Sequence, residues 1–270
     1  MPALGLIASR RPLVIGHRGS CQLAPENTLP SFKLAMDAGA DLVELDYRHT
    51  KEGVPVVIHD AELDRTTDAF QRWKRRHLRV VAKTAAEIQC LDAGRWFGPR
   101  FAGAKVPLLT EALDFILPSS VALIERKAGD AATCTRLLRE KGLVNRVIVQ
   151  SFDWEFLRSF HRQEPAQVLG ALGPARVLPG GRRAFGVSRK LTLAWLNQAR
   201  KTGAKVVVWS QKVSKGSVRL AHERGFRVWV YTVNHQRQAK RLLAAGVDGL
   251  ITNHPRLIRH TLGLRSIPTT

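Results

Sequence analysis

The sequence lacks the marks of a disulfide-stabilised, membrane-spanning or secreted protein. Its cysteines are few, odd in number, widely spaced and outside any metal-binding pattern: Cys21, Cys90 and Cys134. That set predicts free thiols in a reducing, cytoplasmic setting. No run approaches eighteen apolar residues, so we expect no transmembrane helix. Near the N-terminus the basic residues follow the short apolar stretch, which is the wrong order for a secretory signal.

Acidic residues are also scarce. The chain has 43 Lys and Arg against 22 Asp and Glu, which gives a formal net charge of +21. This balance favours attraction to polyanions, namely nucleic acid, an anionic membrane or a phosphorylated substrate. The densest basic stretch, RWKRRHLRVVAK, covers 72–83, and no acidic residue falls between Asp68 and Glu87. A solvated helix face or loop is the simplest interpretation of that stretch.

Short β-branched runs alternate with amphipathic segments. The runs predict nine strands, over 12–16, 41–47, 54–59, 121–126, 146–152, 166–172, 205–210, 227–233 and 248–252. The amphipathic segments predict helices over 28–39, 110–117, 130–142, 192–203, 217–225 and 235–246. Most of these helices end in glycine, the residue favoured just past a helix C-terminus. The repeated order of strand, helix, glycine and strand is typical of parallel βα units.

Nine strands are one more than an eight-stranded barrel needs. The second and third are too close in sequence for a parallel crossover, and Glu52-Gly53 between them predicts a tight hairpin. With a two-residue loop, Asp46 lies opposite His59. Residues 60–106 interrupt the βα rhythm and predict an inserted helical lid over the site. We therefore expect one domain over 1–270: an α/β protein with a distorted TIM (β/α)8 barrel and a small helical insertion.

Polar residues stand at the ends of three predicted strands, where TIM barrels carry their active sites. Glu44 and Asp46 share one face of the second strand because they are two residues apart. Their mutual repulsion is unfavourable unless a proton or a cation lies between them. With Glu125 they offer three carboxylates that can converge on a hard divalent cation. This pattern predicts a metal site.

Histidines and cations accompany these carboxylates. His17 and His59 end different strands and can share general-acid and general-base roles near neutral pH. Arg18 and Lys127 can stabilise the charge of a phosphoryl transition state. The residues therefore indicate metal-assisted phosphoester hydrolysis. Glu26 and Asn27, which precede a predicted helix, are interpreted as capping residues.

The motifs also carry a resemblance. HRG, PENT, VELD, PVVIHD, LDRTT, LDAGRWF, LIERK, VQSF, WVYTVN and GVDGLITNHP follow one another across residues 12–256. In kind, order and spacing they resemble the glycerophosphodiester phosphodiesterase family, the phospholipase C-like TIM-barrel phosphodiesterases. The resemblance implies hydrolysis of small-molecule glycerophosphodiesters to glycerol 3-phosphate and an alcohol, with one Mg²⁺ or Ca²⁺ ion. It also implies a distorted TIM barrel with an inserted helical segment.

The resemblance assigns roles to seven residues. The metal ligands are Glu44, Asp46 and Glu125; the acid–base pair is His17 and His59; the phosphate-contacting cations are Arg18 and Lys127. The implied reaction begins with attack of the substrate's own glycerol 2-hydroxyl on phosphorus, and water then opens the cyclic phosphate. The sequence does not assign the acid and the base between the two histidines. This chain departs from the family in its basic segment after LDRTT and in Asn253, where aspartate is common and to which we assign no role.

Two other functions remain open. A lysophospholipase D-like phosphodiesterase acting on lysophospholipids would use the basic stretch 72–83 to dock on an anionic membrane surface. That hypothesis needs apolar residues among the charges, and the sequence offers Phe70, Trp73, Leu78, Val80 and Val81. A basic binding protein, for example for nucleic acid, is the third hypothesis. It predicts missing catalytic residues, and every expected one is present, so we do not expect a nucleic-acid partner.

Overall fold

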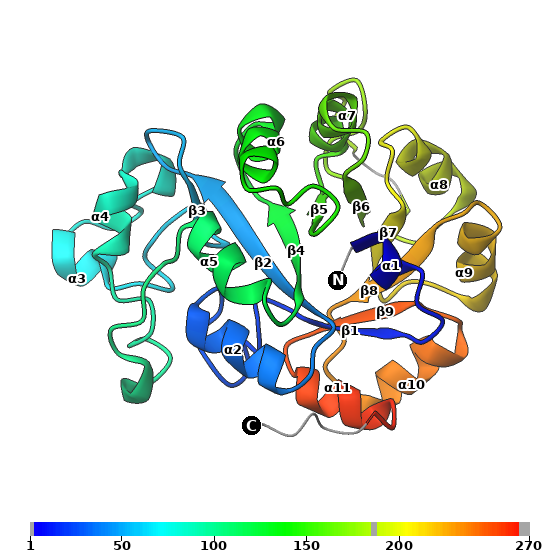
Figure 1. Ribbon diagram of the computed structural model, residues 1–270, viewed down its shortest axis with the longest axis horizontal. Coiled ribbons are helices and arrows are strands. Elements are labelled where there is room, and N and C mark those ends of the chain that lie inside the picture. Colours follow the sequence, from blue (N-terminus) through cyan, green and yellow to red (C-terminus); the bar gives the residue numbers. More distant parts are fainter. Residues whose placement is uncertain (1–2, 185–187, 265–270) are drawn as a thin grey trace.

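Eight parallel strands close into a barrel in the computed structural model, which describes residues 3–184 and 188–264 (Figure 1). The strands are β1 (Leu13–Gly16), β2 (Leu42–His49), β4 (Val121–Arg126), β5 (Ile148–Ser151), β6 (Val168–Gly173), β7 (Val206–Ser210), β8 (Arg227–Tyr231) and β9 (Gly249–Thr252). Each pairs with the next around the ring, and β1 closes it by pairing with both β9 and β2. The predicted TIM barrel and all nine predicted strands are confirmed.

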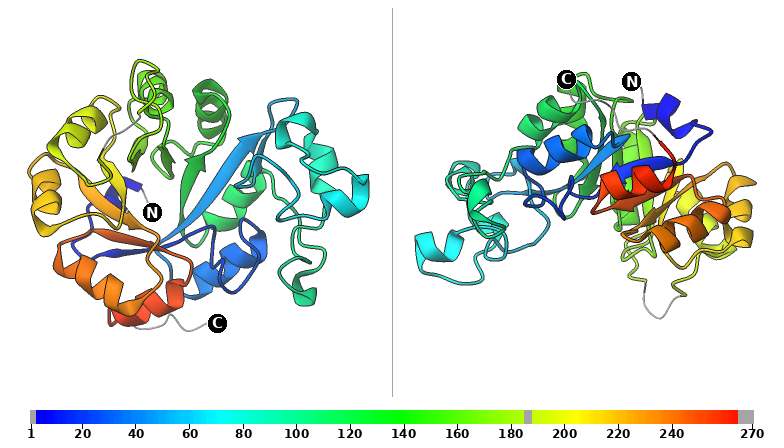
Figure 2. Two further views of the ribbon diagram at one scale, coloured as in Figure 1. Left: turned by 180° about the vertical axis from the view of Figure 1, so that it is seen from behind. Right: turned by 90° about the horizontal axis from the view of Figure 1, so that it is seen from below.

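Helices surround the barrel (Figures 1 and 2). They are α2 (Leu29–Asp37), α5 (Leu109–Ile116), α6 (Ala131–Glu140), α7 (Trp154–Gln163), α8 (Leu193–Arg200), α9 (Lys215–His222), α10 (Gln236–Ala244) and α11 (Pro255–Thr261). The six predicted helices are present, whereas α7 and α11 lie outside the predicted segments. Glycines follow several of these helices at positive φ, for example Gly142 at 63° and Gly203 at 74°. Within the described ranges, no helix has the length and apolar character needed to cross a bilayer.

Strand alternation builds two apolar layers, one inside the barrel and one outside it. Outward residues such as Val43 and Leu45 of β2 pack against the helices. Inward residues such as Leu42, Leu123 and Trp229 fill the N-terminal half of the interior. A short helix, α1 (Ala3–Ile7), lies across that end of the barrel and adds Ala3 and Leu6 to the inner cluster (Figure 1). The polar half of the interior is therefore left at the C-terminal ends of the strands.

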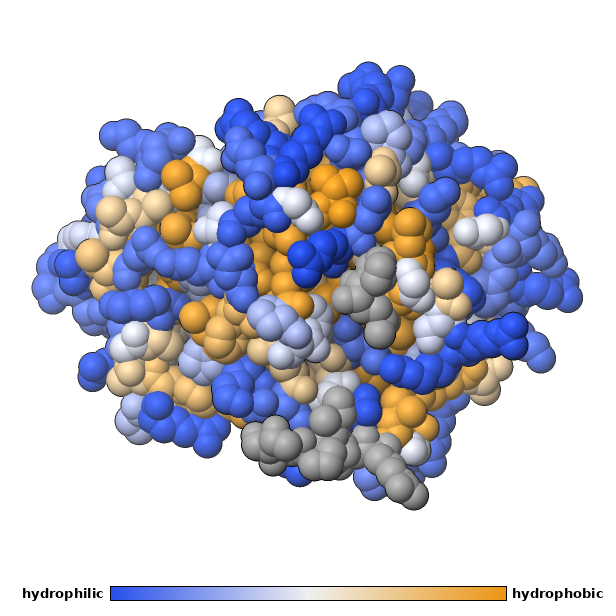
Figure 3. Space-filling view, viewed as in Figure 1, coloured by the Kyte–Doolittle hydropathy of each residue, from blue (hydrophilic) through white to orange (hydrophobic). Residues whose placement is uncertain are grey.

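The N-terminal face has a mixed surface. Hydrophilic side chains cover most of its rim, and apolar residues are visible nearer its centre (Figure 3). Leu4 of α1 contributes to this apolar exposure, at 47% of its surface.

The three cysteines are free thiols: Cys21 is half-buried, Cys90 exposed and Cys134 buried.

The ninth strand, β3 (Pro55–Val57), pairs antiparallel with the end of β2, as the hairpin prediction requires. The predicted register is wrong by one residue, since Tyr47 pairs with Val57 and His49 with Pro55. The loop has three residues rather than two: Thr50 and Val54 are joined by a backbone hydrogen bond of 3.0 Å, and Gly53 takes φ +82°. Three-residue hairpin loops place glycine at this left-handed position. His59 consequently lies beyond β3 instead of opposite Asp46.

The inserted segment 60–106 forms a small lobe beside β2 and β3 (Figures 1 and 2). It contains α3 (Ala69–Trp73), α4 (Ala85–Gln89) and 3₁₀ turns at Val80–Ala82 and Pro99–Phe101. Its buried residues form a core of their own against β3, including Leu63, Leu78, Ile88 and Val106 together with Val56. The helical insertion is confirmed, and it lies on the flank of the barrel.

The inner apolar layer gives a test of how α1 stabilises the barrel. We expect Leu6→Ala to lower the free energy of unfolding by about 2–3 kcal/mol, because it removes a side chain that is 8% exposed and leaves a cavity. The matched control is Leu4→Ala on the same helix, where 47% of the leucine is already in solvent. Urea unfolding measures both variants. Equal losses for the two would show that α1 does not pack into the barrel end.

Candidate active site

Three carboxylates lie inside the barrel, directly above the inner apolar layer. Glu44 and Asp46 share the inward face of β2 with Leu42, and Glu125 is paired with Asp46 in the neighbouring strand β4. They are 1%, 0% and 6% exposed. One oxygen from each lies within 4.8 Å of the others. The structure thus brings together the three predicted metal ligands.

Two cations lie against these carboxylates. The Lys127 Nζ is 3.3 Å from Asp46 Oδ1 and also contacts a Glu125 oxygen. The Arg18 Nε is 3.1 Å from Asp46 Oδ2, and the Arg18 backbone N–H donates a 2.7 Å hydrogen bond to Glu44 Oε2. Both side chains are largely buried, at 16% exposure for Arg18 and 14% for Lys127. The predicted phosphate-contacting residues therefore lie at the same centre.

Burial and mutual repulsion dominate the electrostatics of the carboxylates. Burial, reinforced by the negative charge of Asp46, raises the pKa of both Glu44 and Glu125 above the usual range. Burial acts in the same direction on Asp46, but Lys127 and Arg18 outweigh it and lower the pKa of that carboxyl. Glu44 Oε1 is buried and has no hydrogen-bond partner, and the ammonium group of Lys127 is shared between Asp46 Oδ1 and Glu125 Oε1. Buried acceptors without donors are costly, and oxygen-only sets of this kind suit Mg²⁺ or Ca²⁺.

His17 follows β1 and is oriented by a neutral amide. Its Nδ1 is 2.7 Å from Asn253 Oδ1, and Asn253 is itself positioned by a 2.9 Å hydrogen bond from its backbone N–H to Asn234 Oδ1. Because a carbonyl oxygen only accepts, the imidazole Nδ1 carries the proton and Nε2 is left as a base. Burial, with the charge of Arg18, lowers the pKa of His17 to about 4. His17 is therefore neutral near pH 7, and Asn253, which the sequence left without a role, is its orienting partner.

His59 is oriented by a carboxylate instead. Its Nδ1 is 2.6 Å from Asp60 Oδ1, and Arg65 Nε donates to Asp60 Oδ2 at 2.5 Å. Burial, with the charges of Lys127 and Arg18, lowers the pKa of His59 below its ordinary value, although Asp46 and the hydrogen bond to Asp60 act in the opposite direction. The side chain remains 30% exposed. His59 thus reaches the site from the loop after β3, by a different route from the predicted hairpin pairing.

The capping role predicted for Glu26 and Asn27 is wrong. The residue before α2 is Thr28, and neither neighbour caps the helix. Asn27 is 3% exposed and makes two hydrogen bonds to Asp46. Its Nδ2 donates to Asp46 Oδ2 at 2.9 Å, and its Oδ1 accepts from the Asp46 backbone N–H at 3.1 Å. Glu26 accepts hydrogen bonds from both Arg18, at 2.8 Å, and Arg65, at 2.7 Å. These residues support the site, and they lie too far from Asp46 in sequence for a local pattern to reveal them.

A cavity of about 230 Å³ opens on this centre. Six of the predicted site residues line it, with Asp46 buried beneath them: His17, Arg18, Glu44, His59, Glu125 and Lys127. Gln150, Phe152, Arg176 and Tyr231 complete much of the wall. Within the described chain, the lining includes no residue of the insertion 60–106, and the lid role of that lobe stays a prediction.

The basic stretch 72–83 offers cations but little apolar surface. Of the apolar residues that membrane docking would need, Leu78 and Val80 are buried in the core of the insertion. The Trp73 ring is covered by Lys83, whose Nζ lies 4.1 Å from the ring centroid. Val81 is exposed, at 53%. The geometry therefore gives no support to the membrane-docking hypothesis for this stretch.

Comparison with known proteins identifies relatives that align with this chain over most of their own length. A model described as "Glycerophosphoryl diester phosphodiesterase family" matches residues 17–257. The glycerophosphodiester phosphodiesterase of Bacillus subtilis is 31% identical over 93% of this chain and 87% of that protein. The glycerophosphodiester phosphodiesterase of Caldanaerobacter subterraneus is 31% identical over 92% of this chain and 96% of that protein. The solved structure of an Oleispira antarctica phosphodiesterase with the product sn-glycerol-3-phosphate has a TM-score of 0.81 and 26% identity, covering 95% and 99% of the two chains.

Asn27 gives a test of the support around Asp46. We expect Asn27→Gly to lower the free energy of unfolding by about 1–3 kcal/mol, because it leaves the buried Asp46 N–H without an acceptor and removes a hydrogen-bond donor from the buried Asp46 carboxylate. Glycine keeps the positive φ of 59° that Asn27 adopts. The control is Asn145→Gly, also at positive φ, 65°, where the side-chain oxygen accepts no hydrogen bond. Urea unfolding compares them, and a loss no larger than that of the control would remove Asn27 from the support of the site.

Proposed function

The chain belongs to the glycerophosphoryl diester phosphodiesterase family, and from this membership we propose that it hydrolyses glycerophosphodiesters to glycerol 3-phosphate and an alcohol with one divalent metal ion and two histidines. The observation that carries the proposal is the convergence of three buried carboxylates, two cations and two histidines on one cavity. The bound product of the Oleispira antarctica relative, sn-glycerol-3-phosphate, supports the substrate class.

Glu44, Asp46 and Glu125 are the residues that would bind the metal ion. The buried Glu44 Oε1 has no hydrogen-bond partner, and burial together with the charge of Asp46 raises the pKa of both glutamates, so the three carboxylates fit a hard divalent cation such as Mg²⁺ or Ca²⁺. When bound, the ion supplies positive charge that polarises a phosphoryl oxygen and stabilises the transition state. Arg18 and Lys127 contribute fixed cations to the lining of the same cavity, where they bind the non-bridging phosphate oxygens.

The contrast between the histidine partners supports the following roles in the first step. His17 is neutral, with an amide partner, so its Nε2 accepts the proton of the glycerol 2-hydroxyl as that oxygen attacks phosphorus. His59 has a carboxylate partner that stabilises its imidazolium, so it donates a proton to the departing alcohol oxygen. In the second step water opens the cyclic phosphate, His59 accepts the water proton and His17 returns its proton to the 2-hydroxyl. Both histidines thereby regain their starting states.

Removal of divalent metal tests the ligand assignment. We expect the release of glycerol 3-phosphate from glycerophosphoglycerol to fall at least about 100-fold in EDTA, because the three carboxylates then repel each other and the anionic phosphate. Excess Mg²⁺ or Ca²⁺ restores the rate. A coupled glycerol 3-phosphate dehydrogenase assay measures the product. Full activity in EDTA after exhaustive dialysis would refute the metal site, and failure to release glycerol 3-phosphate under any condition would refute the function.

A second experiment separates the two histidines. We expect His17→Asn and His59→Asn each to reduce kcat for glycerophosphoglycerol by about 10²–10⁴, the usual contribution of a general acid or base. p-Nitrophenolate leaves without protonation, so glycerophospho-p-nitrophenol should restore much of the rate to His59→Asn and little to His17→Asn. Rescue of His17→Asn alone would exchange the two roles. Unchanged kcat in both variants on glycerophosphoglycerol would remove the histidines from the mechanism.

A further inference from the structure

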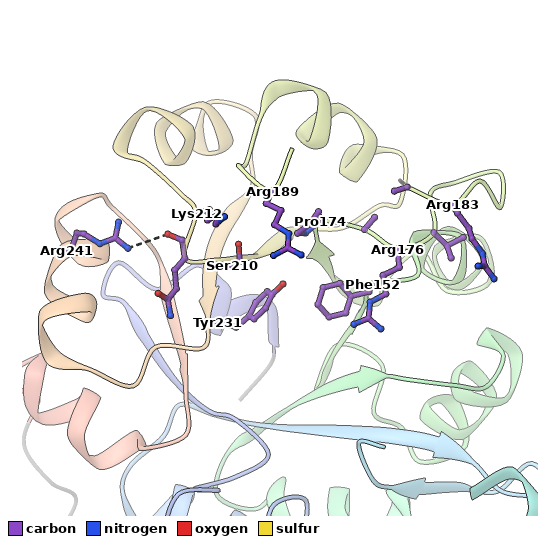
Figure 4. Close-up of a pocket in the computed structure, with 13 residues that line it drawn as sticks. Phe152, Pro174, Arg176, Arg183, Arg189, Ser210, Lys212, Tyr231 and Arg241 are labelled. Atoms are coloured by element: carbon purple, nitrogen blue, oxygen red, sulfur yellow. Dashed lines mark hydrogen bonds between the residues drawn. The ribbon is translucent and has the colours of Figure 1, made fainter. Parts of the chain in front are cut away.

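A second, larger cavity of about 1330 Å³ adjoins the catalytic one, and we call it the basic groove. It lies over the C-terminal ends of β5 to β8 (Figure 4). Phe152, Arg176 and Tyr231 line both cavities, so the groove is continuous with the centre where the scissile phosphate binds. Its volume far exceeds what a choline or ethanolamine group fills. The groove is therefore placed to receive the alcohol side of a larger substrate.

Five cations line the groove: Arg176, Arg183, Arg189, Lys212 and Arg241. Figure 4 shows Arg176 and Arg189 beside Phe152 and Tyr231, with Arg183 and Arg241 toward opposite ends. No acidic residue is among its described lining residues, and none of the five forms an ion pair with a carboxylate in the part of the chain described. Arg241 donates a hydrogen bond of 3.4 Å to the Gln211 backbone oxygen. Like charges gathered without counterions favour an anion between them.

The aromatic pair connects the groove to the catalytic centre. The Phe152 ring centroid lies 5.9 Å from Lys127 Nζ and 5.0 Å from Arg176 Cζ, so one ring contacts a cation of each cavity. Tyr231 packs edge-to-face on Phe152 at 5.9 Å, and its hydroxyl donates a 2.8 Å hydrogen bond to the Gly173 carbonyl oxygen. These contacts build the wall that the two cavities share.

We propose that the basic groove binds a leaving alcohol that carries a second phosphate group, so that polyanionic glycerophosphodiesters are preferred over those with cationic head groups. This inference rests on the proposed function of the adjoining site. A recessed groove that continues the catalytic cavity suits part of a small substrate better than a flat bilayer. Arg176 adjoins the reaction centre, and Arg189 and Lys212 provide further cations for the second phosphate. The cationic head groups choline and ethanolamine would meet five like charges there and no carboxylate among the described lining residues.

The test compares three substrates that share the glycerophosphoryl group and differ in the charge of the leaving alcohol. They are glycerophosphocholine, glycerophosphoglycerol and bis(glycerophospho)glycerol, which adds a second phosphodiester to the leaving side. At about 20 mM salt we expect kcat/KM per cleavable bond to be at least about tenfold higher for bis(glycerophospho)glycerol than for glycerophosphoglycerol, and lowest for glycerophosphocholine. Raising the salt to about 500 mM should remove most of this preference, because exposed charges are screened.

Two double variants test whether the preference for anionic leaving alcohols arises in the basic groove. Arg189→Gln with Lys212→Gln should lower the ratio of kcat/KM between the anionic and the neutral substrate by about tenfold, since it removes two groove cations whose side chains make no hydrogen bonds or ion pairs in the described structure. The matched control is Arg136→Gln with Lys201→Gln, which removes the same charge from exposed positions on α6 and just after α8. The control should keep the wild-type ratio.

The outcomes separate this inference from the function on which it rests. If glycerophosphoglycerol is hydrolysed but the ratio is near one and neither double variant changes it, the groove proposal fails while the proposed function stands. Equal loss of the ratio in both double variants would mean that overall charge, and not the groove, sets the preference. If the groove variant instead loses co-sedimentation with phosphatidylglycerol vesicles and the ratio stays near one, the groove is a membrane-docking surface and the proposal is overturned.

Discussion

The repulsion among Glu44, Asp46 and Glu125 is the constraint around which the catalytic end of the barrel is built. Three carboxylates that are nearly inaccessible to solvent are tolerable only when cations and donors surround them. Arg18, Lys127 and Asn27 each bond to Asp46, and the Arg18 backbone N–H donates to Glu44. Each partner comes from a different loop or strand end, so the charge cluster fixes how those segments meet.

The barrel is distorted where β1 and β2 separate, and this separation leaves space for the loop that carries Arg18. β1 pairs with β2 only at Leu42 and Val43, and farther along β2 the antiparallel β3 takes that edge at Tyr47 to His49. Between them the chain leaving β1 turns back, with Arg18 at φ 52° and Gly19 at φ 86°. A Cβ on Gly19 would lie 2.5 Å from the Ser31 carbonyl carbon, so only glycine permits this approach of the turn to α2. The hairpin and the turn together place Arg18 over the carboxylates.

The sequence predicts those features of the site that follow from the two-residue alternation of strands and from their order along the chain. The alternation of β2 and β4 was sufficient to bring Glu44, Asp46, Glu125 and Lys127 to one centre, because parallel strands end at a common face. The hairpin register depends on whether the loop takes two or three residues, and Gly53 is compatible with both. Asn27, Asn253 and Arg65 were missed because their partners are distant in sequence and their geometry is set by tertiary packing. The insertion's position beside β3 follows from its own apolar core, which no periodic pattern distinguishes from a lid.

The two cavities use positive charge in different ways, and burial explains the difference. Arg18 and Lys127 are less than one-fifth exposed and are each paired with carboxylates, and these contacts restrict their positions. The groove cations are solvent-exposed and have no carboxylate partner among the described residues, so they can adapt to anions of different shape. Fixed charges serve the reacting phosphorus, where a small displacement is costly. In the proposed groove, adaptable charges would serve a leaving alcohol that carries a second phosphate, so one barrel would combine a strict reaction with tolerance of the alcohol's shape.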